Sequence, residues 1–169
     1  MKNVHASGLV IGDRGVIVLG PSGAGKSTLA LGLVARCRAA GMPAWLVGDD
    51  RLVLERHGPR LVARVPGAIA GLAEVYGHGP AAQAHEAAAV IDLCVRLVPA
   101  REAPRLDPGG VELIETVEIA ALAVAERAVA AAMPAVLARL EALGRLRAGC
   151  DETRALQPRP VGADRTPSP

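Results

Sequence analysis

The feature that most constrains this chain is a glycine-rich turn between a short apolar run and a helical pattern. The turn consists of Gly20, Pro21, Ser22, Gly23, Ala24, Gly25, Lys26, Ser27 and Thr28. Its spacing, in which two glycines enclose four residues and precede Lys-Ser, is that of a phosphate-binding loop. Residues 16–19 before it predict a strand buried on both faces, and leucines spaced out to Arg38 predict a helix after it. A strand, this loop and a helix in that order favour an α/β fold.

The residue types in the loop suit the polyphosphate of a nucleotide. Glycines let backbone N–H groups turn inward around phosphate oxygens, and the start of the following helix adds positive partial charge. Lys26 can reach the β- and γ-phosphates, and the Ser27 hydroxyl is a candidate ligand of Mg²⁺. We therefore predict that the loop binds a nucleotide with magnesium; the simpler alternative is a turn that only caps the helix.

Composition excludes several other classes of protein. A length of 169 residues fits one domain, and 51% hydrophobic residues are too many for a wholly disordered chain. The net charge of +2 comes from basic residues that are spread along the sequence, which argues against a nucleic-acid or membrane-surface partner. Neither a membrane-spanning run nor a secretory signal is found. Three cysteines without metal-ligand spacing argue against a disulfide framework and a zinc site, so we expect a cytoplasmic protein.

The remaining pattern predicts strands, hairpins and a second helix. Expected strands cover residues 4–11, 44–47 and 90–98, a hairpin joins 51–55 to 60–65, and 119–124 is either a strand or the opening of a helix. Segments rich in glycine, or in proline and arginine, are expected to be irregular at 66–79 and 99–108. Residues 125–147 predict a helix that Pro134 caps or kinks, and 149–169 predict a disordered tail.

Two acidic positions have a local setting that suits phosphoryl-transfer chemistry. Asp49 and Asp50 follow a buried strand, where a carboxylate beside a phosphate loop can hold Mg²⁺ or accept a proton. Glu74 lies in a glycine-lined segment and is a further candidate metal ligand. The plainer alternatives are a solvated acidic turn for the pair and a surface position for Glu74. The residue pattern alone assigns no role to His5, and it predicts His85 on a helix surface.

In combination, these motifs resemble the catalytic domain of bacterial HPr kinase/phosphorylase, in its short form without a separate N-terminal domain. The resemblance runs from about residue 5 to residue 106, through the upstream His5, the phosphate loop, Val-Gly-Asp-Asp at 47–50, and Pro-x-x-Ile-x-Gly-Leu-x-Glu-Val-x-Gly at 66–77. It implies the mixed-sheet fold that this family shares with phosphoenolpyruvate carboxykinase. We expect the catalytic domain to cover residues 1–148, up to the predicted tail.

The resemblance also implies roles for individual residues. Asp50 matches the family's base toward the acceptor serine, and His5 matches an active-site histidine. Glu74 matches a ligand that holds Mg²⁺ together with the loop serine, and we expect Asp49 to contribute on the metal side. The family's catalytic arginine best matches Arg105, with Arg96 and Arg101 as alternatives. The implied substrates are ATP and an HPr-like phosphocarrier protein, and the implied assembly is a homo-oligomer, commonly a hexamer.

Two departures from the family pattern affect the predicted activity. Tyr76 stands where the signature has an arginine, and a phenol cannot neutralise phosphate charge as a guanidinium does. The Pro-Gly-Arg-Asn segment used in phosphorolysis has no counterpart between Thr116 and Ala130. We therefore predict an ATP-dependent serine kinase without phosphorolysis. The alternatives are a nucleotide-binding sensor or pseudokinase, and a small-molecule kinase with a phosphate loop.

Overall fold

A mixed sheet of nine strands organises the computed structural model, which describes residues 2–144. Its strands are β1 (Lys2–Val4), β2 (Ser7–Ile11), β3 (Arg14–Leu19), β4 (Ala44–Gly48), β5 (Leu52–His57), β6 (Arg60–Arg64), β9 (Ala88–Val98), β10 (Val111–Ile114) and β11 (Val117–Ala125). They follow the order β1-β5-β6-β9-β3-β2-β4, with β11 joined to β9 and β10 joined to β11. The remaining elements are α1 (Lys26–Ala39), a short 3-10 turn (Gly67–Ile69), β7 (Leu72–Val75), β8 (Gly79–Ala82) and α2 (Val129–Ala142).

The strand directions bring four strand ends to one edge of the sheet. β3 and β11 both pair with β9 in parallel, whereas β2 is antiparallel to both β3 and β4. Strands β3, β4, β9 and β11 therefore end at the same edge, and β2 begins there. Ligands of α/β sheets bind outside the carboxyl ends of the strands, so this edge is where a site is expected.

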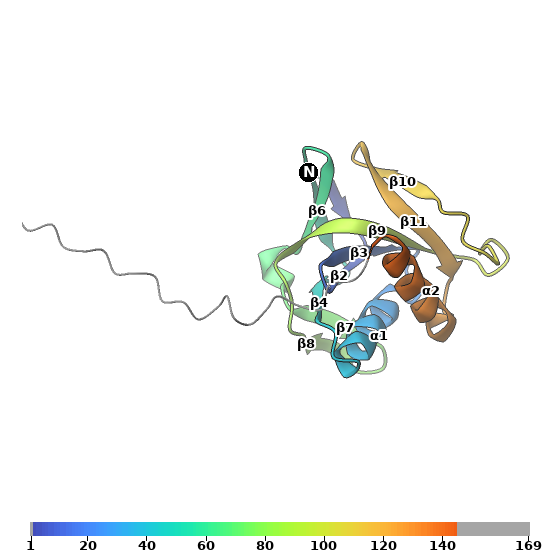
Figure 1. Cartoon of the computed structure of the whole chain (residues 1–169). Helices are drawn as coiled ribbons and strands as arrows, with labels where there is room; N and C mark the ends of the chain where they lie inside the picture. The colour runs from blue at the N-terminus through green and yellow to red at the C-terminus, as the bar shows by residue number, and fades with distance from the viewer. Residues whose placement is uncertain (1, 145–169) are drawn as a thin grey trace, which may run out of the picture.

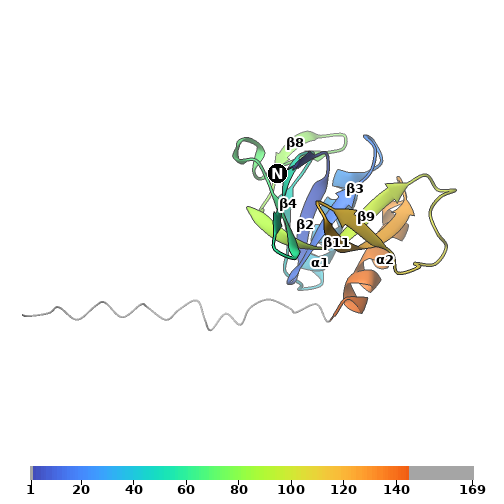
Figure 2. The ribbon, with the colours of Figure 1, turned by 90° about the horizontal axis from the view of Figure 1, so that it is seen from above.

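The core lies on both faces of this sheet. Val16 and Val18 of β3 pack in a cluster with residues of both helices, whereas Ile17 between them packs in a second cluster with residues of β5 and β6. This alternation explains why the apolar run at 16–19 has no polar side, because successive side chains of a strand point to opposite faces. Both helices lie on the same side of the sheet (Figure 1 and Figure 2).

The structure confirms the predicted α/β fold with a mixed sheet and most of its elements. The strand before the phosphate loop, the helix after it, the strand at 44–47 and the hairpin at 51–65 all form. The segment 119–124 is a strand, within β11. Within residues 2–144, the structure contains no helix that is both long and apolar enough to cross a membrane.

The expectation of one continuous strand at 4–11 is wrong. The strand breaks at His5 and Ala6, because β1 pairs with β5 while β2 pairs with β3 and β4. The histidine therefore lies in the link between two strands that belong to different parts of the sheet.

Elements between residues 66 and 114 also differ from expectation. The glycine-rich segment contains β7, which forms a separate two-stranded sheet with β8, and β10 was not expected. Small residues and proline dominate β8 (Gly-Pro-Ala-Ala), so no strand pattern marks it. His85 lies between β8 and β9, where it bridges to Leu46, and is not on a helix.

The second helix begins at Val129 and not at 125, because β11 extends to Ala125 and Arg127 has a positive φ of 58°. Pro134 lies inside the helix. The helix ends at Ala142, with Leu143 as its C-cap, so the predicted end at 147 is wrong. The domain boundary at 148 and the predicted tail at 149–169 lie outside the described residues.

Replacing Pro134 by alanine is expected to raise the free energy of unfolding, by up to about 3 kcal/mol, because proline removes a helical hydrogen bond. Its side chain is exposed, so little packing is lost. Thermal unfolding followed by circular dichroism tests this. As a control, Ala138→Gly at an exposed position of the same helix should lower stability by about 1 kcal/mol. A Pro134→Ala variant that melts below the wild type would contradict the expectation.

Candidate functional site

The phosphate loop leaves the end of β3 and enters α1 at Lys26. Gly25 caps the helix with a left-handed backbone conformation (φ 99°), which residues other than glycine rarely adopt. A Cβ on Gly20 would lie 2.9 Å from the Cβ of Leu97, so glycine also allows the loop to approach β9 closely. The first turn of α1 contains no acidic residue. The loop and helix start therefore form an anion-binding arrangement to which the first turn of the helix itself adds no negative charge.

Lys26 is held over this loop by the loop's own carbonyl groups. Its Nζ donates hydrogen bonds to the carbonyl oxygens of Gly20 (3.1 Å) and Pro21 (3.0 Å). Burial lowers the pKa of Lys26, and the negative charges of Asp50 and Asp49 oppose that shift. The ammonium group is thus anchored where phosphate oxygens would replace or join these carbonyl partners.

His5 and Asp50 form an exposed pair. His5 Nε2 lies 3.1 Å from Asp50 Oδ1, and their side chains are 53% and 73% exposed. Asp50 has a φ of 66°, and the N–H of Arg51 donates to the carbonyl of Asp49 across it (2.8 Å). Such a tight turn with positive φ is rare and strained for a residue with a side chain. Backbone strain of this kind concentrates at functional sites.

Asp49 has the opposite surroundings, although it is the next residue in the chain. It is 4% exposed, and both of its carboxylate oxygens have protein partners. Oδ1 accepts a hydrogen bond from the Ser7 hydroxyl (2.5 Å), and Oδ2 accepts one from the backbone N–H of Glu74 (3.0 Å). Asp49 therefore ties β2, the end of β4 and β7 together. Its predicted role as a magnesium ligand stays a prediction.

One cavity of about 310 Å³ brings most of the predicted site residues together. Its lining consists of His5, Ser22, Gly23, Gly25, Lys26, Ser27, Thr28, Asp50, Glu74 and Tyr76. A larger hollow, of about 510 Å³, lies between α2, β11 and the loop at 99–110, but alanines form most of its lining. We place the functional site in the smaller cavity, because the phosphate loop and the ionisable side chains converge there.

The cavity fits a magnesium ion that arrives with a nucleotide. Within residues 2–144 no three His, Cys, Asp or Glu side chains cluster closely enough to hold a metal by themselves. Ser27 and Glu74 share the cavity, however, and supply one hydroxyl and one carboxylate. Mg²⁺ is commonly held by one or two carboxylates together with substrate phosphates, and it keeps several waters. The donor set therefore suits a nucleotide-borne ion.

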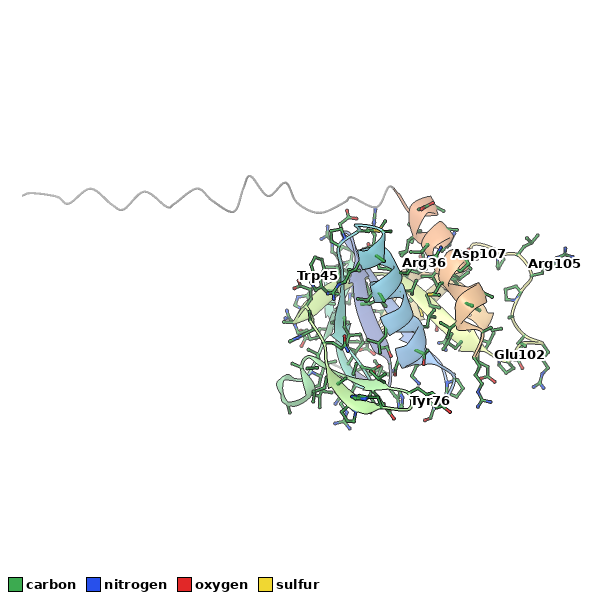
Figure 3. The ribbon with its side chains drawn as sticks, turned by 90° about the horizontal axis from the view of Figure 1, so that it is seen from below. Arg36, Trp45, Tyr76, Glu102, Arg105 and Asp107 are labelled. Carbon is green, nitrogen blue, oxygen red and sulfur yellow. The ribbon has the colours of Figure 1, made fainter. Side chains whose placement is uncertain are left out.

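The three candidates for the catalytic arginine do not line this cavity. Arg105 lies on the 99–110 loop, well away from Tyr76 (Figure 3). Arg96 forms two hydrogen bonds with Glu112, which lower the pKa of that carboxylate, and Arg101 contacts Glu102. The structure thus does not bring any of the three candidates into the cavity with Asp50.

Sequence analysis missed a different arginine that contacts the phosphate loop. Arg127 follows β11; its backbone N–H donates to the carbonyl of Ala24 (2.9 Å), and its Nε donates to that of Gly23 (3.2 Å). Its position follows from the parallel pairing of β11, which ends at the same sheet edge as β3. The sequence signal was too weak to find it, because the preceding segment fitted either a strand or a helix.

Comparison with known proteins agrees with this fold. The family model described as the HPr Serine kinase C-terminal domain matches residues 1–132. A solved structure, that of the Hpr(Ser) kinase/phosphatase from Coxiella burnetii, is similar to this chain with 25% identity and a TM-score of 0.69. The alignment covers 85% of this chain and 100% of that one. No curated protein matches the sequence. The chain belongs to the HPr serine kinase C-terminal domain family.

Proposed function

We propose that this protein is an ATP-dependent serine kinase whose acceptor is an HPr-like phosphocarrier protein. The observation that carries the proposal is the cavity in which the phosphate loop, Lys26 and the His5–Asp50 pair meet. Membership of the family supports the class of acceptor. The buried free Cys37 and Cys94 support a cytoplasmic location. The family resemblance supports a homo-oligomer, with a hexamer as the expected assembly.

The nucleotide side of the cavity follows from the loop. Backbone N–H groups at the start of α1 and the Lys26 ammonium would hold the β- and γ-phosphates of ATP. Ser27 and Glu74 would hold the magnesium ion, which neutralises phosphate charge when bound. Arg127 would keep the loop in shape through its bonds to Gly23 and Ala24. Positioning and charge neutralisation are what phosphoryl transfer mainly requires.

The acceptor side follows from Asp50. Its exposed carboxylate lies where a serine hydroxyl can approach from solvent, and His5 orients it. As the serine oxygen bonds to the γ-phosphorus and ADP leaves, Asp50 accepts the hydroxyl proton. Asp49 acts differently: it holds the strand that carries Glu74. We assign the forward reaction alone, because Tyr76 replaces the arginine of the family signature and the Pro-Gly-Arg-Asn segment used in phosphorolysis has no counterpart in this sequence.

A second function, nucleotide sensing without transfer, is favoured by the same observation at position 76. The cavity would bind Mg-ATP equally well in either case. The two functions differ only in whether labelled phosphate reaches an acceptor, so binding and transfer must be measured on the same preparation.

Lys26→Ala is expected to weaken Mg-ATP binding at least tenfold and to abolish transfer, because a charge-assisted contact to phosphate is worth about 1.5–3 kcal/mol. Calorimetry with Mg-ATP and radiolabel transfer to HPr measure both effects. The chain contains one other lysine, Lys2, which is exposed on β1. Lys2→Ala is therefore the matched control and should behave like the wild type. Unchanged nucleotide binding by Lys26→Ala would remove the basis of the proposal.

Asp50→Asn should bind Mg-ATP with an affinity close to that of the wild type but transfer phosphate about 10²–10⁴-fold more slowly, as expected for loss of a general base. Asp13→Asn, in the turn between β2 and β3 at the opposite edge of the sheet, is the control. If nucleotide binding falls together with transfer, Asp50 acts on the metal side. A wild-type protein that binds Mg-ATP and transfers nothing would support the sensor.

Asp49→Asn is expected to lower the free energy of unfolding by about 1–3 kcal/mol. Asparagine replaces one of the two carboxylate oxygens by an NH₂ group, which cannot accept the hydrogen bond that this oxygen accepted. Chemical denaturation measures this loss. Asp50→Asn, at an exposed side chain, should leave stability nearly unchanged. Equal stability of the two variants would contradict the structural role of Asp49.

A further inference from the structure

The hairpin of β7 and β8 presents an apolar face to solvent beside the cavity. Leu72 pairs with Ala82, and Glu74 pairs with Pro80, so these four side chains share one face of the hairpin. All four are exposed. The neighbouring Ala73 points the other way and packs into the core beside α1. One face of this small sheet is therefore anchored, and the other has no partner within the described chain.

Tyr76 continues this exposed face at the tip of the hairpin. Its side chain is 95% exposed, and Figure 3 shows it projecting at the end of the hairpin. The chain has one tyrosine, one tryptophan and no phenylalanine. The tryptophan, Trp45, is covered by the guanidinium of Arg38 (5.8 Å to the ring centre). The most exposed aromatic group of this protein thus lies at the entrance of its functional cavity.

We propose that the hairpin face of Leu72, Pro80, Ala82 and Tyr76 docks the acceptor protein, with Tyr76 as the specificity-determining contact for an apolar side chain beside the acceptor serine. This inference rests on the proposed kinase function. Tyr76 and Asp50 line the same cavity. A serine hydroxyl that reaches the Asp50 carboxylate therefore brings its neighbouring residues past the phenol ring.

The extent of the face favours a protein over a small molecule. Leu72 and Ala82 do not line the cavity, and they lie four or more residues along the strands from the tip. At about 3.3 Å per residue, the apolar face extends roughly 13 Å from Tyr76. A nucleotide or a small acceptor held on the phosphate loop would not cover it.

The residue types also suit a protein partner. Tyrosine gives a large contact area with little loss of side-chain entropy, and it is enriched among the residues that dominate binding energy at interfaces. The only charged side chain of the face is Glu74, which is next to the expected magnesium ion. The expected partner surface is therefore apolar next to its serine, without a requirement for a charged patch.

The test compares variants with HPr as the acceptor and Mg-ATP as the donor. Tyr76→Ala should raise the KM for HPr at least tenfold, while kcat at saturating HPr and the dissociation constant for Mg-ATP change less than twofold. Tyr76→Phe should retain a KM near that of the wild type, because the ring makes the contact. Leu72→Ala should raise the KM severalfold. Leu113→Ala removes an exposed leucine from β10, outside the hairpin, and serves as the control.

A second measurement does not depend on turnover. Calorimetry with an HPr variant that carries alanine at the acceptor serine should show at least tenfold weaker binding to Tyr76→Ala than to the wild type. If KM and affinity are unchanged in Tyr76→Ala while the wild type phosphorylates HPr, the docking face is overturned and the kinase function stands.

The remaining outcomes identify other occupants and overturn the proposal. Weaker Mg-ATP binding by Tyr76→Ala, restored in Tyr76→Phe, would make the ring a nucleotide contact. A change in oligomeric state on dilution, seen for Tyr76→Ala and Leu72→Ala alone, would make the face an interface between copies of this chain. A wild type that binds Mg-ATP and leaves HPr unmodified contradicts the kinase function itself, and the docking proposal with it.

Discussion

The geometry of the site depends on the two hydrogen bonds that the carboxylate of Asp49 accepts. It is buried, and its two oxygens are bonded to Ser7 at the start of β2 and to the backbone of Glu74 in β7. A buried charge is tolerated only when hydrogen bonds satisfy it, so the three segments are fixed relative to one another. Because β7 belongs to a separate small sheet, this bond helps to set the Glu74 strand against the main sheet, together with the packing of Ala73 into the core.

Two neighbouring aspartates thereby acquire different properties. Hydrogen bonds hold the side chain of Asp49 in the interior, and the positive φ of Asp50 turns its own carboxylate out beside His5. The strained backbone persists because the bonds of Asp49 fix the preceding residue. One acidic dipeptide thus provides both a structural tie and an exposed carboxylate. The same hairpin that Asp49 contacts carries both Glu74 and Tyr76, so these two side chains of the cavity share one support.

Those parts of the fold and site that depend on local sequence could be predicted. The phosphate loop, the helix after it and the strand that ends just before Asp49 follow from spacing and turn chemistry within a few residues of one another. The hairpin of β7 and β8 could not be predicted, because its small residues carry no strand pattern and its position depends on a bond from a residue 25 positions earlier. Which arginine contacts the phosphate loop also depends on long-range pairing. Arg127 reaches the loop because β11 runs parallel to β9. Arg105 instead lines the hollow between α2 and the loop at 99–110.

The sequence by itself determined which chemical groups are available to the site. It specified a glycine-rich turn with one lysine, a serine that can bind metal, a pair of carboxylates and an unusual tyrosine, because each of these is a property of residue type and near spacing. Tertiary structure alone decided which carboxylate is buried, which arginine reaches the loop and which face of a hairpin stays exposed. These outcomes depend on strand direction and register between segments far apart in the chain, and no local pattern encodes them.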